Sequence, residues 1–293
     1  MEEKDIERNE IEKKKKPITI MGISIWRLMA YFIIYSMAGF VIETLFGLVT
    51  KGVIESRKSF LYGPFCAIYG VGAVIMIPSL QKFKKNNYTL FIGGMLIGSL
   101  VEYLISLIGE FIFHIKWWDY SDMPFNINGR ICIAFSFFWG ILAIYLMSHF
   151  NPLVDRLINK MKEKISPKIL KIGVILVIIF IFIDFLITSF ALKMFFTRVV
   201  TEYNIELLEQ NEYILECTEL YKNEDIKNFT LKYFSDEKML KTFPNIKVTG
   251  KDENVIWICD VLKDIQPYYV RVFTPKYFTV SYTHLRAHET AAN

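Results

Sequence analysis

The sequence predicts an all-α membrane protein, with a bundle of about five transmembrane helices followed by a small α+β segment. Hydrophobic residues make up 53% of the 293 residues and charged residues 22%, whereas soluble domains are usually about 45–50% apolar and about 25% charged. Charge gathers in the first sixteen residues, in short connectors and after Arg198. Several of the apolar stretches between them reach the roughly 20 residues that a membrane-spanning helix needs.

Residues 1–22 are predicted to form a polar cytoplasmic tail. The first sixteen read MEEKDIERNEIEKKKK, and an apolar block follows. That block is too long for the apolar region of a signal peptide and lacks a small-residue cleavage site. We therefore interpret it as a retained first helix.

Five apolar segments define a transmembrane domain over residues 23–196. The second segment is short and rich in glycine, and its start merges with the preceding loop. The predicted helices cover residues 23–48, 63–80, 88–115, 131–150 and 170–196.

Lysine and arginine in the short loops predict the orientation, because cytoplasmic loops carry an excess of them. The N-terminal tail and the loops around residues 82–85 and 156–168 are the most basic. Lys51, Arg57 and Lys58 in the first loop oppose this pattern in part. We expect a cytoplasmic N-terminus and a C-terminus outside the plasma membrane. The same pattern accounts for the net charge of +4, so no nucleic-acid partner is expected; the expected partner is the lipid bilayer.

Residues 197–279 are predicted to form an extracytoplasmic C-terminal segment. Apolar spacing from Val199 to Leu220 favours an amphipathic helix. The runs VIWICDVL (255–262) and YYVRVF (268–273) are typical of short strands.

Residues 280–293 are expected not to be native protein. The run VSYTHLRAHET from Val280 to Thr290 back-translates to a DNA sequence that resembles a transposase adapter used for library preparation. His284 and His288 are therefore left out of the functional argument. We expect the native sequence to be truncated near Thr279, so that the residues after it are not those of the native C-terminus.

Four carboxylates lie within the predicted helices, where an ionisable group is costly and is a functional candidate. They are Glu43, Glu102, Glu110 and Asp184. Glu102 and Glu110 share one broad helix face, at roughly 12 Å of rise and about 80° of rotation. His114 follows Glu110 at i+4. Asp184 has no obvious partner in the sequence and is a possible second site or oligomer contact.

Two loops on the outer side add polar and aromatic residues. Trp117, Trp118 and Tyr120 suit an interfacial aromatic belt. For the charged residues, pairing that only fixes the helix register and a functional cavity are equally good interpretations. The candidate polar cavity comprises Glu43, Arg57, Glu102, Glu110, Asp119, Asn126, Asn128 and Arg130.

The sequence contains no motif of an ATPase, a serine hydrolase or a zinc metalloprotease. The four cysteines lack metal-ligand spacing, so no metal and no cofactor are expected. Cys217 and Cys259 can pair outside the membrane, which the sequence alone does not establish.

Several motifs between roughly residues 25 and 155 point to a known family. They are Ala38-Gly39-Phe40 with Glu43, the run RKSFLYGPFCAIYG (57–70), Glu102-Tyr103 with Glu110, WWDYS (117–121), FNINGRIC (125–132), Ser136 with Trp139-Gly140, and Asn151-Pro152. With these motifs the chain resembles a bacterial membrane family described as "Putative ABC-transporter type IV". Phe40 and Ala67 stand where tryptophan and proline are expected, and the fifth helix and the run FPNI (243–246) are similar to longer members.

This resemblance implies a permease-like membrane component, with any ATPase or other membrane subunit on a separate chain. We expect an outward-facing polar site in a transport protein. A membrane sensor or envelope assembly factor, acting through the C-terminal segment, is the first alternative. An intramembrane or lipid-modifying enzyme is the second, and it requires the carboxylates and His114 to converge.

Overall fold

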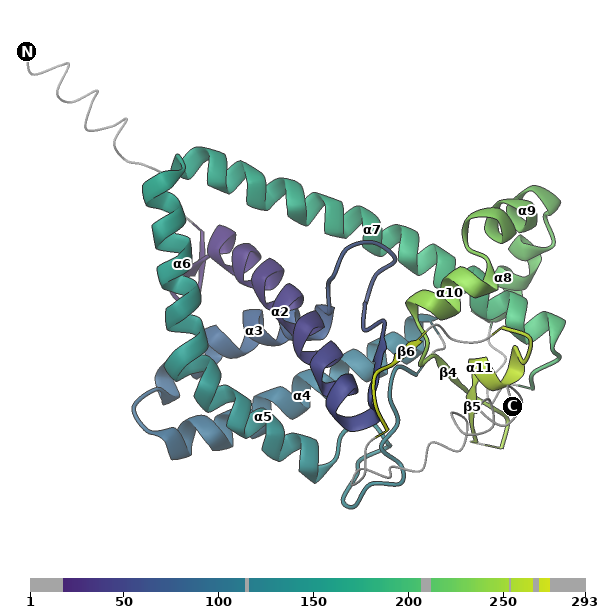
Figure 1. Ribbon diagram of the computed structural model, residues 1–293, viewed down its shortest axis with the longest axis horizontal. Helices are drawn as coiled ribbons and strands as arrows, with labels where there is room; N and C mark the ends of the chain where they lie inside the picture. The colour runs from purple at the N-terminus through teal and green to yellow at the C-terminus, as the bar shows by residue number, and fades with distance from the viewer. Residues whose placement is uncertain (1–17, 114–115, 207–211, 253, 266–268, 275–293) are drawn as a thin grey trace, which may run out of the picture.

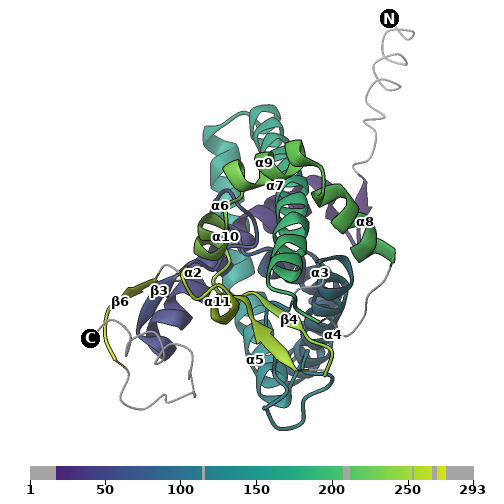
Figure 2. The same ribbon diagram turned by 90° about the vertical axis from the view of Figure 1, so that its right-hand side faces the viewer.

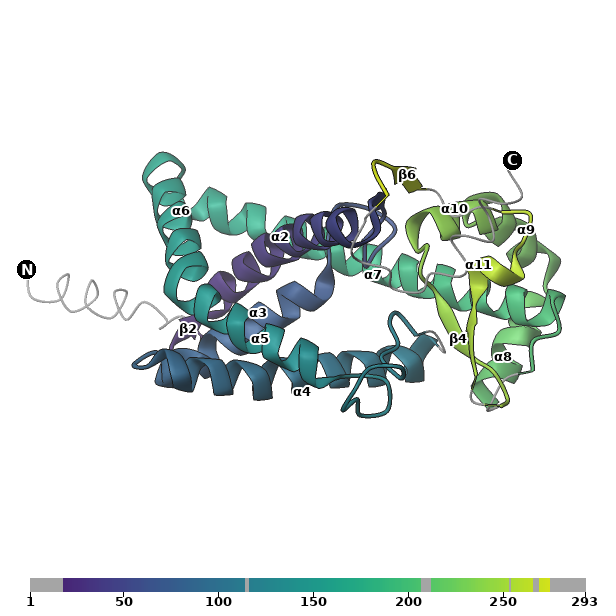
Figure 3. The ribbon, with the colours of Figure 1, turned by 60° about the horizontal axis from the view of Figure 1, so that its bottom comes forward.

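The computed structural model describes residues 18–113, 116–206, 212–252, 254–265 and 269–274. Long helices run side by side along the molecule, and the C-terminal elements gather at one end (Figures 1 and 3). The described elements, in chain order, are β1 (Thr19–Ile20), β2 (Ile23–Ser24), α2 (Ile25–Lys51), β3 (Val53–Glu55), α3 (Ala67–Leu80), η1 (Gln81–Phe83), α4 (Asn87–Phe113), α5 (Ile133–Tyr145), η2 (Leu146–Phe150), α6 (Asn151–Lys164), α7 (Pro167–Glu202), α8 (Glu212–Tyr221), α9 (Glu224–Tyr233), α10 (Asp236–Thr242), β4 (Lys247–Thr249), β5 (Val255–Trp257), α11 (Ile258–Val261) and β6 (Tyr269–Arg271).

Among the described residues, four helices are long and apolar enough to cross a membrane: α2, α4, the continuous helix over 133–164, and α7. Large apolar side chains such as Phe46, Leu100, Phe111 and Phe182 are exposed on their outer faces, as lipid-facing positions require. All five predicted segments contain a helix, but the expected count of about five membrane-spanning helices is corrected to four for the part of the chain that the structure describes. The helix of the second segment, α3, is too short to be counted with the others.

The predicted second helix, residues 63–80, begins only at Ala67 and is 14 residues long. Gly63 has a left-handed backbone (φ +73°), which cannot continue a right-handed helix. Residues 56–66 instead form a loop that enters the bundle, where Phe60 and Phe65 pack with Ile181 of α7. The segment therefore enters as irregular backbone and leaves as a short helix.

Helices α2 and α7 supply the partners of this inserted loop. The backbone N–H of Tyr62 donates to Asp184 at 3.1 Å, and that of Leu61 donates to Thr188 at 2.9 Å. The N–H of Cys66 donates to the carbonyl of Ser36 at 2.9 Å. Because these partners lie mid-helix, α3 starts part of the way across the bundle. Asp184, for which the sequence offered no partner, is buried (1% exposed) and holds this loop.

The predicted fourth helix, residues 131–150, begins at Ile133 and continues through the π-helical turn η2 into α6. Helix α6 turns across one end of the bundle (Figure 1). There Asp155 pairs with Arg27 of α2 at 2.6 Å, and Tyr35 donates to Asn151 at 3.3 Å. We call this end, which also carries the lysines of 82–85, the basic end.

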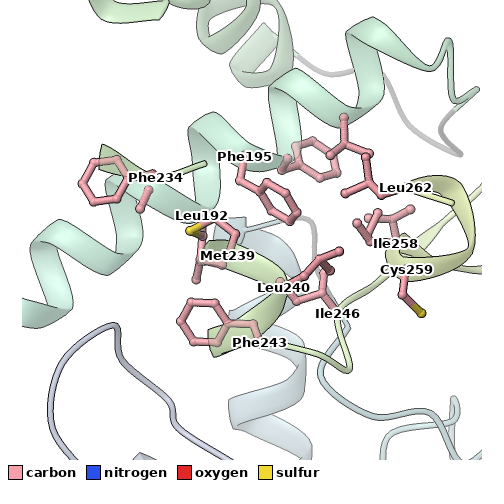
Figure 4. Close-up of a cluster of buried hydrophobic side chains, with 14 of the residues drawn as sticks. Leu192, Phe195, Phe234, Met239, Leu240, Phe243, Ile246, Ile258, Cys259 and Leu262 are labelled. Atoms are coloured by element: carbon pink, nitrogen blue, oxygen red, sulfur yellow. The ribbon is translucent and has the colours of Figure 1, made fainter. Parts of the chain in front are cut away.

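The C-terminal elements surround the last turns of α7 at the other end, which we call the capped end (Figure 2). Helix α7 runs to Glu202 rather than stopping at residue 196, so the amphipathic helix expected from Val199 is instead the end of α7 followed by α8. The fully buried Arg198 anchors this end by pairing with Asp236 and donating to the carbonyl of Phe234 at 2.9 Å. Figure 4 shows side chains of α7 packed against those of α10 and α11.

Of the two predicted strands, the first forms β5 over Val255–Trp257 and then turns into α11. Strand β5 pairs with β4 in antiparallel register. The second forms β6, which pairs not with β5 but with β3 of the helical bundle, Val53 opposite Arg271. The C-terminal segment is therefore joined to the bundle by backbone hydrogen bonds.

Because Asp184 holds the inserted loop, we predict that replacing it lowers the stability of the protein. An Asp184→Ala variant removes a buried acceptor (1% exposed) of the Tyr62 N–H and the Thr188 hydroxyl, which costs about 1–3 kcal/mol. We expect a lower midpoint of thermal unfolding in detergent, with part of the loss recovered in Asp184→Asn. Ile183→Ala is the control, because Ile183 is half exposed on the lipid side. Equal midpoints for Asp184→Ala and wild type contradict the interpretation.

Candidate functional site

Two carboxylates from different helices meet aromatic donors inside the bundle. The hydroxyl of Tyr69, in the first turn of α3, donates to Glu43 of α2 at 2.8 Å. The indole N–H of Trp139 in α5 donates to Glu102 of α4 at 2.9 Å, and the hydroxyl of Tyr120 donates to the other oxygen of Glu102 at 3.0 Å. Glu102 is only 4% exposed.

These two groups adjoin each other. The rings of Tyr69 and Trp139, which donate to Glu43 and Glu102, lie 6.3 Å apart, centroid to centroid. We call Glu43, Tyr69, Glu102, Tyr120 and Trp139 together the polar centre.

The carboxylates of the polar centre accept hydrogen bonds from uncharged side chains. Tyr69, Tyr120 and Trp139 stabilise negative charge by hydrogen bonding but do not neutralise it, unlike the arginine or lysine of a buried ion pair. Burial, followed by the charge of Glu102, raises the pKa of Tyr120, so this hydroxyl remains a protonated donor. The arrangement can therefore hold a positive charge or a proton between two carboxylates.

Glu110 and Arg130 lie in a separate ion pair nearer the capped end. Arg130 contacts Glu110 at 2.7 Å and donates to Ser106 at 3.1 Å. Thr249 of β4 donates to Glu110 at 2.9 Å. Glu110 and Arg130 thus bind helix, loop and C-terminal segment together, which favours the structural interpretation for this pair.

Asp119, Asn126 and Asn128 shape the loop between α4 and α5. Asp119 accepts from both the N–H (3.1 Å) and the hydroxyl (2.6 Å) of Ser121. Asn126 donates to two loop carbonyls and accepts from the N–H of Gly129. Asn128 has a left-handed backbone and donates to Tyr103 at 3.0 Å. These contacts are those of turn-forming residues.

The two adjacent tryptophans contact different parts of the protein, one the C-terminal segment and the other the loop itself. Trp117 packs against Phe243 of the C-terminal segment, with ring centroids 5.8 Å apart. Trp118 donates its indole N–H to the carbonyl of Arg130 at 2.9 Å. The structure thus gives each a packing role, and their place in an interfacial belt remains a prediction.

Arg57 belongs to a charged cluster at the junction with the C-terminal segment. Glu55 accepts from Arg57 at 2.6 Å, from Lys51 at 2.8 Å and from Asn245 at 3.3 Å. Burial raises the pKa of Glu55, but the charges of Lys51 and Arg57 outweigh burial and leave it below its usual value. By their hydrogen bonds and ion pairs, the eight predicted cavity residues divide into four groups, and a cavity shared by all eight remains a prediction.

Tyr69 and Trp139 complete the polar centre but were absent from the predicted site. Both stand in runs that carried the family resemblance, as an aromatic residue followed by glycine, and that repeated pair was the available signal. His114 lies outside the described residues. Within the described ranges, no three His, Cys, Asp or Glu side chains are grouped to hold a metal. All four cysteines are free, Cys217 and Cys259 included.

Fold and site together define a multi-pass integral membrane protein, mostly helical, with carboxylates held inside its helical bundle. The family described as "Putative ABC-transporter type IV" matches residues 30–189, more than half of the chain, and the protein belongs to this family. No curated protein and no solved structure matches the chain.

The lowered pKa of Glu55 predicts how the junction responds to acid. A carboxylate with a depressed pKa contributes stability above its unfolded-state pKa and loses it as the pH falls through the folded-state pKa. We expect Glu55→Gln to lower the thermal midpoint most at neutral pH, with the gap from wild type closing on acidification. Glu219→Gln is the control, because Glu219 is exposed and pairs with the equally exposed Lys222, three residues away. A gap for Glu55→Gln that does not change with pH contradicts the assignment.

Proposed function

We propose that the protein is a permease-like transport component whose solute binds at the polar centre. The convergence of Glu43 and Glu102 from two membrane helices, each held by a neutral aromatic donor, is the observation that carries this proposal. Placing a carboxylate in a membrane helix costs about 2.5–3.5 kcal/mol on insertion scales. Two such carboxylates, hydrogen bonded to neutral groups, destabilise the bundle more than apolar packing between the helices would. Their presence therefore favours a functional role over a structural one.

A cationic solute suits this centre best. Negative carboxylates attract it, and the aromatic faces of Tyr69 and Trp139 stabilise a cation that has lost its water. Carboxylates that face a bundle interior often mark substrate or ion pathways in membrane proteins. The other ionisable groups support this assignment, because Glu110, Arg130, Arg57 and Asp184 already have structural partners.

The proposed approach to the polar centre is from the capped end. Tyr120, which donates to Glu102, belongs to the loop between α4 and α5, so this loop can report on or control access. We propose that the capped end faces outward and the basic end faces the cytoplasm, because the lysines of 82–85 and the cations of α6 lie there. An energy-coupling ATPase, if the protein uses one, is a separate chain.

The test is transport by the full chain in proteoliposomes, measured with a panel of labelled inorganic and organic cations. We expect Glu102→Gln and Glu43→Gln each to lower the initial rate by about tenfold or more, because one lost charge-assisted interaction is worth about 1.5–3 kcal/mol. Glu163→Gln is the matched control, because Glu163 lies on α6 away from the centre.

Two results contradict the proposal. One is full transport by the double variant Glu43→Gln/Glu102→Gln. The other is that wild-type protein, shown to be folded by a cooperative thermal unfolding transition, transports no cation of the panel in either direction.

A membrane sensor remains the second candidate, supported by the way the C-terminal segment is attached. Backbone pairing of β3 with β6, together with the Thr249–Glu110 hydrogen bond, connects this segment to the helices that carry the polar centre. A deletion after Phe196 is a poor test, because it removes the partners of Leu192 and Phe195 in a buried core.

A disulfide across the β3–β6 pair tests the sensor directly. Ile54 and Val270 are register partners and both are exposed, and facing strand residues lie within disulfide reach. If the protein signals by moving the segment, the oxidised Ile54→Cys/Val270→Cys variant loses function and regains it with reductant. If it is a permease core, oxidation leaves transport unchanged. Each single cysteine variant serves as the control.

A further inference from the structure

The two long helices α2 and α4 carry the same spacing of a glycine and the carboxylate of the polar centre. Gly39 precedes Glu43 by four residues, and Gly98 precedes Glu102 by four. Both helices are 27 residues long, and each is followed by a loop and a second helix, α3 or α5. The contacts of these residues show whether the likeness extends beyond spacing.

Each glycine lies in close contact with an aromatic side chain of the second helix. A Cβ built on Gly39 would lie 2.4–2.5 Å from Cγ, Cβ and Cδ2 of Tyr69. A Cβ built on Gly98 would lie 2.6–2.8 Å from Cβ, Cγ and Cδ2 of Trp139. The same three atoms of an aromatic side chain thus cover the same helix position in both pairs. That aromatic side chain then donates to the carboxylate one turn further along.

The glycine after each aromatic residue also lies in a close contact, here with side chains of the first helix of its pair. A Cβ on Gly70 would meet Ser36 and Phe32, and a Cβ on Gly140 would meet Met95 and Phe91. Three residues further on, Ala73 and Ala143 are both buried. The positions align at one constant offset in the first helix, with 32, 36, 39 and 43 matching 91, 95, 98 and 102, and at another in the second, with 69, 70 and 73 matching 139, 140 and 143.

The loops extend the correspondence to the two arginines. Arg57 packs over Gly47, whose Cβ would lie 3.1 Å from the guanidinium. Arg130 donates to Ser106 at 3.1 Å, and position 106 matches position 47 at the offset of the first helix. The number of residues between the arginine and the aromatic residue differs in the two loops, so the two helices of each unit align at different offsets.

We infer that α2–α3 and α4–α5 are two copies of one structural unit, and that Glu43–Tyr69 and Glu102–Trp139 are equivalent halves of one site. Both units run the same way along the bundle, since the end of α3 contacts the start of α4 through Leu80 and Gly93. Equivalent residues, Tyr69 and Trp139, lie 6.3 Å apart, ring centroid to ring centroid, across the boundary. Two units with the same orientation are the arrangement of parallel internal repeats in membrane transporters.

The functional part of this inference rests on the proposed function. A cation at the boundary between the units meets two carboxylates in matching positions, and Tyr69 and Trp139 act as matching positioning residues. Tyr120, which belongs to only one unit, makes the halves unequal: among the described residues, Glu102 accepts from Trp139 and Tyr120, and Glu43 accepts from Tyr69. Access from the loop therefore acts on one half of the site.

The structural part is tested by three glycine substitutions in the full chain. Alanine favours a helix over glycine, so Gly173→Ala, where nothing lies within 4 Å, should leave the thermal midpoint unchanged or slightly raised. Gly39→Ala and Gly98→Ala should each lower it by roughly 2–10 °C, because overpacking a close contact is destabilising. If either variant behaves like Gly173→Ala, the two units are not equivalent and the inference is overturned.

Exchange of the aromatic residues tests their equivalence in function. Tyr69→Phe and Trp139→Phe keep a ring but remove the donor, and both should reduce cation transport severalfold while the protein stays folded. Tyr69→Trp and Trp139→Tyr place the counterpart's donor at each position and should restore more transport than phenylalanine does. Phenylalanine variants with wild-type transport, or exchanges no better than phenylalanine, overturn equivalent positioning. If wild-type protein moves no cation while the glycine results hold, the repeat stands and the proposed function fails.

Discussion

A polar group inside a bilayer must find its partner within the protein, because lipid chains offer no hydrogen bonds, and this constraint organises the bundle. Residues 56–66 bring irregular backbone into the bundle, and Asp184, Thr188 and Ser36 supply the partners that it needs. The short helix α3 can start part of the way across only because this loop is satisfied. That start in turn brings Tyr69 to Glu43.

The same requirement separates groups that look alike in the sequence. Glu110 and Arg130 neutralise each other and join the bundle to β4, and Glu55 does so with Lys51 and Arg57 beside Asn245. Glu43 and Glu102 receive neutral donors instead. Charges paired at the periphery hold the fold together, whereas the carboxylates in the middle keep their capacity to bind, and this contrast supports a solute site at the polar centre.

Duplication gives a physical account of how such a centre forms. One helix pair with a close glycine contact places an aromatic donor beside a carboxylate. Two such pairs, side by side, bring two carboxylates together without any further adaptation of the backbone. The C-terminal segment then covers the end where both loops lie, through the β3–β6 pairing and the buried end of α7 (Figures 3 and 4).

The sequence by itself determined the membrane class, the apolar segments and the family, because hydropathy and motif spacing are local properties. It also identified Glu43 and Glu102 as functional candidates, because an ionisable side chain in a membrane helix is energetically unfavourable. Only the tertiary structure decided that α3 is short, that Asp184 serves the inserted loop, that β6 pairs with β3, and that Tyr69 and Trp139 belong to the site. Each of these depends on which distant residue supplies a hydrogen bond or leaves room for a neighbour. Spacing along the chain does not contain that information until the helices pack.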